Sequence, residues 1–145
     1  MAELQVLSGR EASIFACITD TVVAPEPVLP PVRETDAVTF FDDWLRRLPR
    51  VNRIAMRGLL WTAEVAPLFT GFGGRLRRLE PTRRREWLRS DEKGPVAQTR
   101  MILKLLVSAA QLAYYGDDQI LNRLGYDPDA NKRRGDELRA KEGRP

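Results

Sequence analysis

The side chains that most often do chemistry at neutral pH are scarce in this sequence. Its 145 residues include no histidine, which removes the usual general base and the commonest metal ligand. Its one cysteine, Cys17, has no second cysteine with which to form an intrachain disulfide, a zinc–thiolate site or a haem attachment motif. Cys17 lies in an apolar stretch, where we expect a buried structural thiol and not a nucleophile.

The carboxylate pairs and the glycine-rich loop are equally poor candidates for catalysis. Asp42-Asp43 and Asp117-Asp118 are adjacent in sequence, so on a helix their side chains diverge, and Asp117 is better explained as a helix cap. The loop Gly71-Phe72-Gly73-Gly74 matches neither the dinucleotide fingerprint nor the P-loop, and no strand pattern precedes it. We therefore expect no catalytic residue, no cofactor site and no metal site in this chain.

One group of side chains is suited to binding nucleic acid. Arginines between Arg75 and Arg89 surround Trp87, an arrangement in which guanidinium groups hold phosphates while an aromatic ring stacks on a base. Trp87 and Leu88 also fall where an amphipathic helix would pack inward, and arginine outnumbers lysine twenty to four along the whole chain. Nucleic-acid binding is therefore the second hypothesis.

The stronger candidate is a set of aromatic residues near loops and expected helix ends. Tyrosine and phenylalanine are costly to leave exposed, and aromatic side chains are enriched in protein–protein interfaces. An alternative stays open, in which the same rings close the core of this chain. The partner-binding set consists of Phe69, Phe72, Tyr114, Tyr115 and Tyr126.

The net charge of +4 is unevenly distributed along the sequence. Residues 1–45 contain two basic and eight acidic side chains, whereas residues 46–100 contain fourteen basic and five acidic ones. Such segregation favours an electrostatically directed contact, with nucleic acid, anionic lipid or an acidic protein as the partner.

The elements that must position these residues are helices. Ser8 and Glu11 have the spacing of a capping box, and an apolar stripe from Ile14 to Val22 follows at helical intervals. This first helix should end near Ala24, because prolines occupy positions 25, 27, 30 and 31 and form an extended connector.

Two further helices follow the prolines. Thr35 or Asp36 caps the first of them, and Pro49 suits the first turn of the second, which should end at Pro67. The first carries a core pattern of Phe41, Trp44, Leu45 and Leu48. On the second, one face is shared by Val51, Ile54, Gly58, Trp61 and Val65. We expect this face to be packed, with Gly58 where another helix comes close.

The second half of the sequence contains the longest apolar stretch. Pro81 opens a helix that reaches about Ser90, and residues 101–115 are apolar except at three positions. At 15 residues the stretch is shorter than the ~20 that a membrane-spanning helix needs. We expect a central helix surrounded by its neighbours, with the alternative that another chain covers part of it. Asp117 caps a short helix that follows.

The overall prediction is an all-α domain over residues 1–128, an irregular bundle of about six helices, followed by a charged tail over 129–145. The tail has one large apolar residue, Leu138, and should be disordered unless it lies along a partner. The first eleven residues lack the basic segment and apolar run of a signal peptide and any twin-arginine motif, so we expect a cytoplasmic protein.

Three segments of the sequence resemble the gluconate 2-dehydrogenase subunit 3 family. The first is Ser8-Gly9-Arg10-Glu11 leading through Ile18 to Pro25, and the second is the helix start from Leu79 to Leu88. The third and most specific is Ala113-Tyr114-Tyr115-Gly116-Asp117 followed by Leu124-Gly125-Tyr126-Asp127. Together they cover residues 7–128.

The resemblance implies a small helical subunit of a dehydrogenase. Its large partner would be a flavoprotein of the glucose–methanol–choline oxidoreductase class, which carries the FAD and the chemistry. Many members of the family bear a twin-arginine signal; this sequence has none, which favours a cytoplasmic complex or a purely stabilising role. The leading hypothesis is thus a non-catalytic accessory subunit that binds and stabilises an FAD-dependent alcohol or sugar dehydrogenase, with any membrane contact made through the complex.

Overall fold

The computed structural model describes residues 4–23, 29–92 and 97–142, and these form helices joined by short loops. The α-helices are α1 (Gly9–Val23), α2 (Ala37–Arg47), α3 (Arg50–Phe69), α4 (Pro81–Glu92), α5 (Ala97–Tyr115), α6 (Asp118–Arg123) and α7 (Pro128–Glu142). Two 3-10 turns, η1 (Val32–Glu34) and η2 (Leu76–Arg78), lie between them. The described residues contain no strand, which confirms the all-α prediction.

The start of α1 has the predicted capping box. The backbone N–H of Ser8 donates to Glu11 Oε2 at 2.8 Å, and the N–H of Glu11 donates to Ser8 Oγ at 3.3 Å. The helix is described as far as Val23, and its expected end near Ala24 lies outside the described residues. Of the proline connector, positions 25 and 27 lie outside the described residues.

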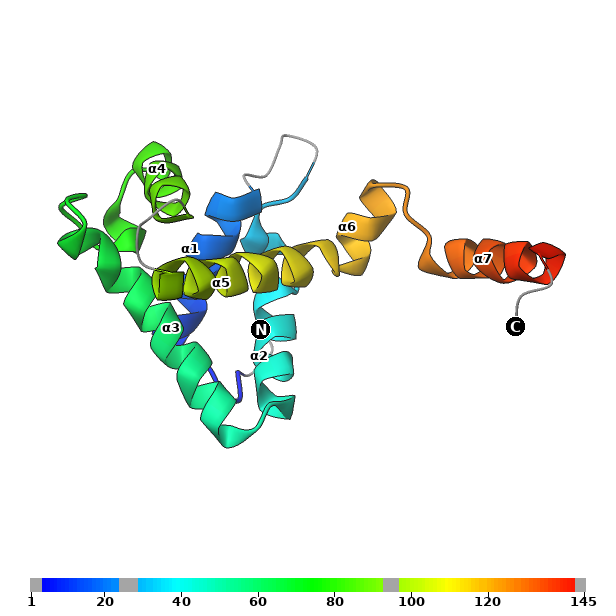
Figure 1. The fold of residues 1–145 in the computed structure, drawn as a ribbon, viewed down its shortest axis with the longest axis horizontal. Coiled ribbons are helices and arrows are strands. Elements are labelled where there is room, and N and C mark those ends of the chain that lie inside the picture. The colour runs from blue at the N-terminus through cyan, green and yellow to red at the C-terminus, as the bar shows by residue number, and fades with distance from the viewer. Residues whose placement is uncertain (1–3, 24–28, 93–96, 143–145) are drawn as a thin grey trace.

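The core is built where α5 crosses α1. Helix α5 also packs against α2, α3 and α4, so it is the central helix of the bundle (Figure 1). The rings of Phe15 and Phe41 stack with centroids 3.9 Å apart and an interplanar angle of 3°. Trp87 and Tyr114 are the largest fully buried side chains among the described residues.

Asp117 connects the beginnings of two helices. Its Oδ1 accepts the backbone N–H of Gln119 at 2.8 Å and so caps α6 as predicted, while its Oδ2 accepts the N–H of Asp36 at 2.7 Å. Asp36 occupies the N-cap position of α2, but its own side chain makes no capping hydrogen bond. A single carboxylate thereby fixes α6 to the start of α2.

Helix α3 continues past the proline that was expected to end it. Pro67 lies inside the helix, which ends two residues later at Phe69. A proline at this position cannot donate the backbone hydrogen bond to the fourth residue before it, and its ring, which is buried here, crowds the carbonyl of that residue. The loss of one hydrogen bond so near the helix end does not stop the last half turn.

The expectation that the charged tail is disordered is wrong for residues 128–142, which form α7. Asp127 Oδ1 accepts the backbone N–H groups of Asp129 and Ala130 at 2.9 and 3.0 Å, and Pro128 occupies the first helical position. The cap and the proline favour a helix that begins here, which the charged composition of the tail does not indicate. Helix α7 extends away from the bundle (Figure 1). Leu138 on this helix is exposed.

Candidate partner-binding surfaces

The aromatic residues predicted to bind a partner lie at two separate places. Phe69, at the end of α3, is 84% exposed, and Phe72 is partly buried in the loop after it. Tyr115 and Tyr126 are exposed at the end of α5 and after α6. The five residues therefore do not form one cluster.

Tyr114 belongs to the core and not to a surface. Its side chain is 0% exposed, and its hydroxyl donates to the backbone carbonyl of Pro30 at 2.6 Å. Tyr115 packs edge-on against it with ring centroids 5.3 Å apart. The ring of Tyr114 therefore closes the core of this chain, which was the alternative to partner binding, and is unavailable to a partner. Burial also raises the pKa of its hydroxyl above the ordinary 10.0.

Helix α3 has two apolar faces, and the one predicted to be packed points away from the bundle. Val51 is 76% exposed and Ile54 is 62% exposed, and a Cβ added at Gly58 would meet nothing within 4 Å. The expected close approach of another helix at Gly58 is therefore wrong within the described residues. The exposed apolar residues form what we call the outward stripe of α3: Val51, Ile54, Trp61, Leu68 and Phe69.

The buried face of α3 was missed because its spacing is equally regular. Met56, Leu60, Ala63 and Pro67 are buried there. At about 100° per residue, this face and the outward stripe lie about 160° apart around the helix. Both have helical periodicity, so the sequence pattern offered no means of choosing which one faces the core.

Helix α5 repeats this arrangement. Leu103, Leu106, Ala110, Ala113 and Tyr114 are buried against its neighbours. An opposite stripe, about 170° away at ~100° per residue, contains the exposed residues Met101, Leu105, Leu112 and Tyr115. The expectation of a central helix is confirmed, but its neighbours do not surround it.

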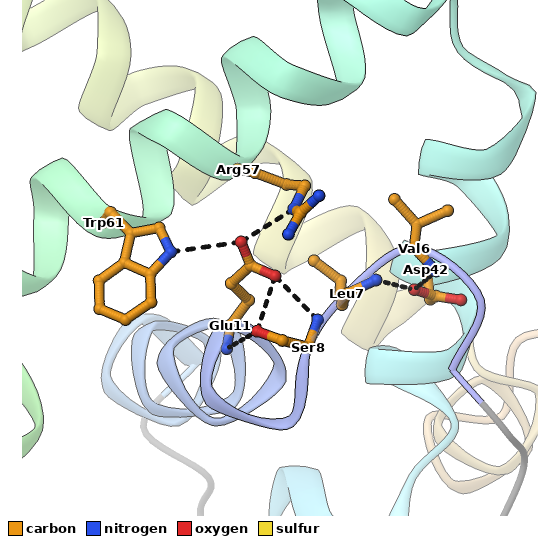
Figure 2. Close-up of polar contacts among 7 residues, drawn as sticks. All are labelled: Val6, Leu7, Ser8, Glu11, Asp42, Arg57 and Trp61. Atoms are coloured by element: carbon orange, nitrogen blue, oxygen red, sulfur yellow. Dashed lines mark hydrogen bonds and ion pairs between the residues drawn. The ribbon is translucent and has the colours of Figure 1, made fainter.

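A buried carboxylate holds the middle of α3 against the start of α1. Glu11 Oε1 accepts hydrogen bonds from Arg57 Nε at 2.9 Å and from Trp61 Nε1 at 3.2 Å, as Figure 2 shows. Burial raises the pKa of Glu11, but the hydrogen bonds from Arg57 and Ser8 and the charge of Arg57 outweigh it, so the pKa lies below the ordinary 4.5. The indole of Trp61 is thereby fixed in orientation at the edge of the outward stripe.

A second carboxylate fixes the segment before α1. Asp42 on α2 is buried and accepts the backbone N–H groups of Gln5, Val6 and Leu7 at 2.7, 3.0 and 2.7 Å. Two of these donors are visible in Figure 2. Its neighbour Asp43 instead lies 3.5 Å from Arg46 on the surface, so the two carboxylates diverge as expected.

The thiol of Cys17 is partly buried and contacts an arginine. Arg84 Nη1 donates to Cys17 Sγ at 2.7 Å. Burial raises the pKa of the thiol above the ordinary 9.0, although the charge of Arg84 acts in the opposite direction. A thiol with a raised pKa is a poor nucleophile at neutral pH.

The arginine-rich segment lacks the stacking ring that the nucleic-acid hypothesis needs. Trp87 is buried, and its Nε1–H donates to Thr70 Oγ1 at 3.1 Å. Arg77 and Arg84 are partly buried, and the other arginines of the segment are exposed. Arg83 lies 5.7 Å from the centroid of the Phe72 ring. Arg75, Arg78 and Arg83 line a cavity of about 560 Å³ beside that ring.

The described residues contain neither a metal-binding cluster nor a membrane-spanning helix. No group of three or more histidine, cysteine, aspartate or glutamate side chains there is arranged to hold a metal ion. No helix in the same part of the chain is long and apolar enough to cross a membrane.

Comparison with known proteins gives no match for this chain. No family model, no curated protein and no solved structure is significantly similar to it.

Proposed function

We propose that this protein is a non-catalytic subunit that binds and stabilises a larger flavoprotein dehydrogenase. The observation that carries the proposal is the outward stripe of α3, an ordered apolar surface on a helix that is already packed on its opposite face. Val51, Ile54 and Phe69 are each more than half exposed. Exposed apolar surface of this kind marks sites of protein–protein contact.

The class of the partner comes from the sequence resemblance alone. It is a flavoprotein of the glucose–methanol–choline class that oxidises an alcohol or a sugar, with the FAD bound in that large subunit. The small subunit supplies contact area and no reacting group, and the complex is cytoplasmic. Cell fractionation of the tagged complex tests the compartment.

Co-expression with a flavoprotein dehydrogenase encoded beside this chain tests the proposed function. We expect the two chains to co-elute in size-exclusion chromatography, and the flavoprotein to lose solubility or FAD-dependent activity when it is made alone. A flavoprotein that is soluble and fully active alone and never co-elutes would contradict the proposal.

A pair of matched variants locates the contact. Ile54→Asp places a charge on the outward stripe and should abolish co-elution. Asn52→Asp places the same charge on an exposed position of the same turn, off the stripe, and should leave co-elution unchanged. Equal effects of the two variants would show that the stripe is not the contact.

A second candidate function rests on the exposed arginines of the 75–89 segment. None of Arg75, Arg78, Arg83, Arg85 and Arg89 has a carboxylate within 4.0 Å among the described residues. Binding of this kind would weaken steeply with salt, with a log–log slope of about −0.9 per phosphate contacted on duplex DNA. Absence of any mobility shift at low salt would eliminate this candidate.

A further inference from the structure

The outward stripe of α3 has a basic border on one edge only. Arg50, Arg53 and Arg57 recur at i, i+3 and i+7, which places them along one side of the helix next to Ile54. At about 100° per residue, the other edge is formed by small or uncharged residues, among them Ala55 and Thr62. The face is therefore asymmetric in charge.

The basic border opens into a cavity that is lined by no carboxylate of the described residues. The cavity has a volume of about 360 Å³ and lies between α3 and the segment that Asp42 holds. Its lining residues are Gln5, Val6, Arg50, Arg53, Ile54 and Arg57. Three guanidinium groups and one residue of the outward stripe thus share one hollow.

Only one of the three guanidinium groups has an acidic partner in the described part of the chain. Arg57 pairs with Glu11, whereas Arg50 and Arg53 have no carboxylate within 4.0 Å there. The Nε atom of Arg53 is buried and has no hydrogen-bond partner within residues 4–23, 29–92 and 97–142. Buried donors are nearly always paired, so Arg53 is a guanidinium group whose hydrogen bonds are incompletely satisfied.

We propose that α3 docks an amphipathic helix of the partner protein whose apolar stripe is bordered by carboxylates. The apolar residues of that helix cover Val51, Ile54 and Trp61, and its border carboxylates enter the hollow and accept from Arg50 and Arg53. Arginine and carboxylate form charge-assisted, often bidentate hydrogen bonds, which fix register as well as affinity. This inference deepens the proposed function by naming the chemistry of the contact.

Two other occupants fit these observations less well. A second copy of this chain, packed helix to helix along the same stripe, would place arginines against arginines, because Glu11 beside this face is buried and already engaged by Arg57. A nucleic acid would satisfy the arginines but would leave the apolar stripe facing phosphate and water. A protein helix with both an apolar stripe and an acidic border satisfies the two features together.

Binding of two designed peptides tests the proposal directly. Both are stapled 20-residue helices with the same leucine stripe, one bordered by glutamate and the other by lysine, and their dissociation constants are measured by fluorescence anisotropy with the full chain. We expect the glutamate-bordered peptide to bind at least about tenfold more tightly, with the difference shrinking as salt is raised. Equal binding, tighter binding of the lysine peptide or no binding of either would overturn the proposal.

Charge reversal provides the matched variants. Arg50→Glu combined with Arg53→Glu should invert the preference between the two peptides, and Arg50→Gln combined with Arg53→Gln should abolish it. Arg85→Glu with Arg89→Glu makes the same change of charge on α4 and should leave the preference intact. Circular dichroism of each variant checks that the fold is retained, and a preference that survives charge reversal in a folded variant would overturn the proposal.

The competing occupants give results of their own. Concentration-dependent dimerisation of the wild-type chain that Ile54→Asp abolishes would overturn the proposal in favour of a second copy. Oligonucleotide binding lost in the Arg50→Glu, Arg53→Glu variant would overturn it in favour of nucleic acid. If the flavoprotein co-elutes with that double variant as it does with wild type, this inference is contradicted and the proposed function is not. If the peptides bind as expected but the flavoprotein does not co-elute, only the proposed function is contradicted.

Discussion

The carboxylate of Asp42 on α2 accepts the backbone N–H of Leu7, the residue before the capping box of α1, at 2.7 Å. The same carboxylate accepts two more backbone N–H groups, from Gln5 and Val6. A side chain of α2 thus supplies the acceptors for a segment that has no helix or strand to provide them. Gln5 and Val6 of this segment line the arginine-lined hollow.

Replacement of Asp42 should therefore be costly. Asp42→Asn removes the charge and turns an amide donor toward backbone donors, so we expect the free energy of unfolding to fall by about 2–4 kcal/mol. The control is Asp43→Asn on the next residue, where a half-exposed ion pair with Arg46 is lost, and the expected change is below about 0.5 kcal/mol. Urea unfolding followed by circular dichroism measures both. Similar losses for the two variants would contradict the assignment of the anchoring role to Asp42.

Glu11 should make stability depend on pH in the acid range. Its folded-state pKa lies below the ordinary 4.5, so its contribution is fully present above the unfolded-state pKa and is lost as the pH falls through the folded-state value. We expect Glu11→Gln to destabilise the protein at pH 7 and to differ much less from wild type at pH 3. Urea unfolding at the two pH values measures this, with Glu34→Gln at an exposed carboxyl as the control. A difference that does not change with pH would rule out the ionised carboxylate as the cause.

Cys17 should react slowly while the protein is folded. Its raised pKa lowers the thiolate fraction at pH 7.5, and partial burial limits access. We expect alkylation by iodoacetamide to be at least about tenfold slower than that of a free cysteine and to reach the free rate in denaturing urea. Mass spectrometry of timed samples measures the rates. A native rate equal to that of free cysteine would contradict the structural role.

Substitutions of the two tyrosines at the end of α5 should have different effects, because Tyr114 lies in the core and Tyr115 on the surface. Tyr114→Phe removes a hydrogen bond to the buried carbonyl of Pro30 and should cost about 1–2 kcal/mol of unfolding free energy. Tyr115→Asp should leave helicity and stability largely unchanged. It should weaken binding to the partner if the exposed stripe of α5, to which Tyr115 belongs, is part of the contact. Thermal unfolding and size-exclusion chromatography of the complex distinguish the two effects. Global unfolding of the Tyr115→Asp variant would place Tyr115 in the core.

Helix α7 should be dispensable for the stability of the bundle. Among the described residues no other helix packs extensively against it, and its only large apolar side chain, Leu138, is 52% exposed. Removing residues 128–145 should reduce the far-ultraviolet helical signal while changing the free energy of unfolding by less than about 0.5 kcal/mol. A loss above about 1 kcal/mol would mean that α7 packs on the bundle in solution.

The sequence revealed the helices better than it revealed their orientation. Caps at Ser8 and Asp117 and the starts at Pro49 and Pro81 are local signals, and the helices begin there or one residue later. Which face of α3 is buried depends on contacts with α1, which is far away in sequence, and with η2 beyond the following loop. Because the two faces are equally periodic, the sequence pattern does not decide between them. The same limit applies to Tyr114 and Tyr115, which are neighbours with opposite surroundings.

The carboxylates that shape the candidate surface were also beyond local reasoning. Local sequence shows Asp42 only as one half of an adjacent carboxylate pair, because its three backbone partners lie 35–37 residues away. Glu11 was recognised as a cap, and its contacts to Arg57 and Trp61 on α3 require the packed bundle. The spacing of Arg50, Arg53 and Arg57 is the signal in the sequence that indicates a basic edge on α3, and these arginines line the hollow.

The two-faced construction of α3 has a consequence for how fast the proposed partner binds. Because the inward face of α3 is already packed and Glu11 already orients Trp61, the docking surface is ordered before any encounter. Association then involves no folding of this chain, so the free energy of ordering a helix is not subtracted from the affinity. We expect a single-phase association without a slow rearrangement step on this side of the complex, and any slow phase seen in stopped-flow experiments would belong to the partner.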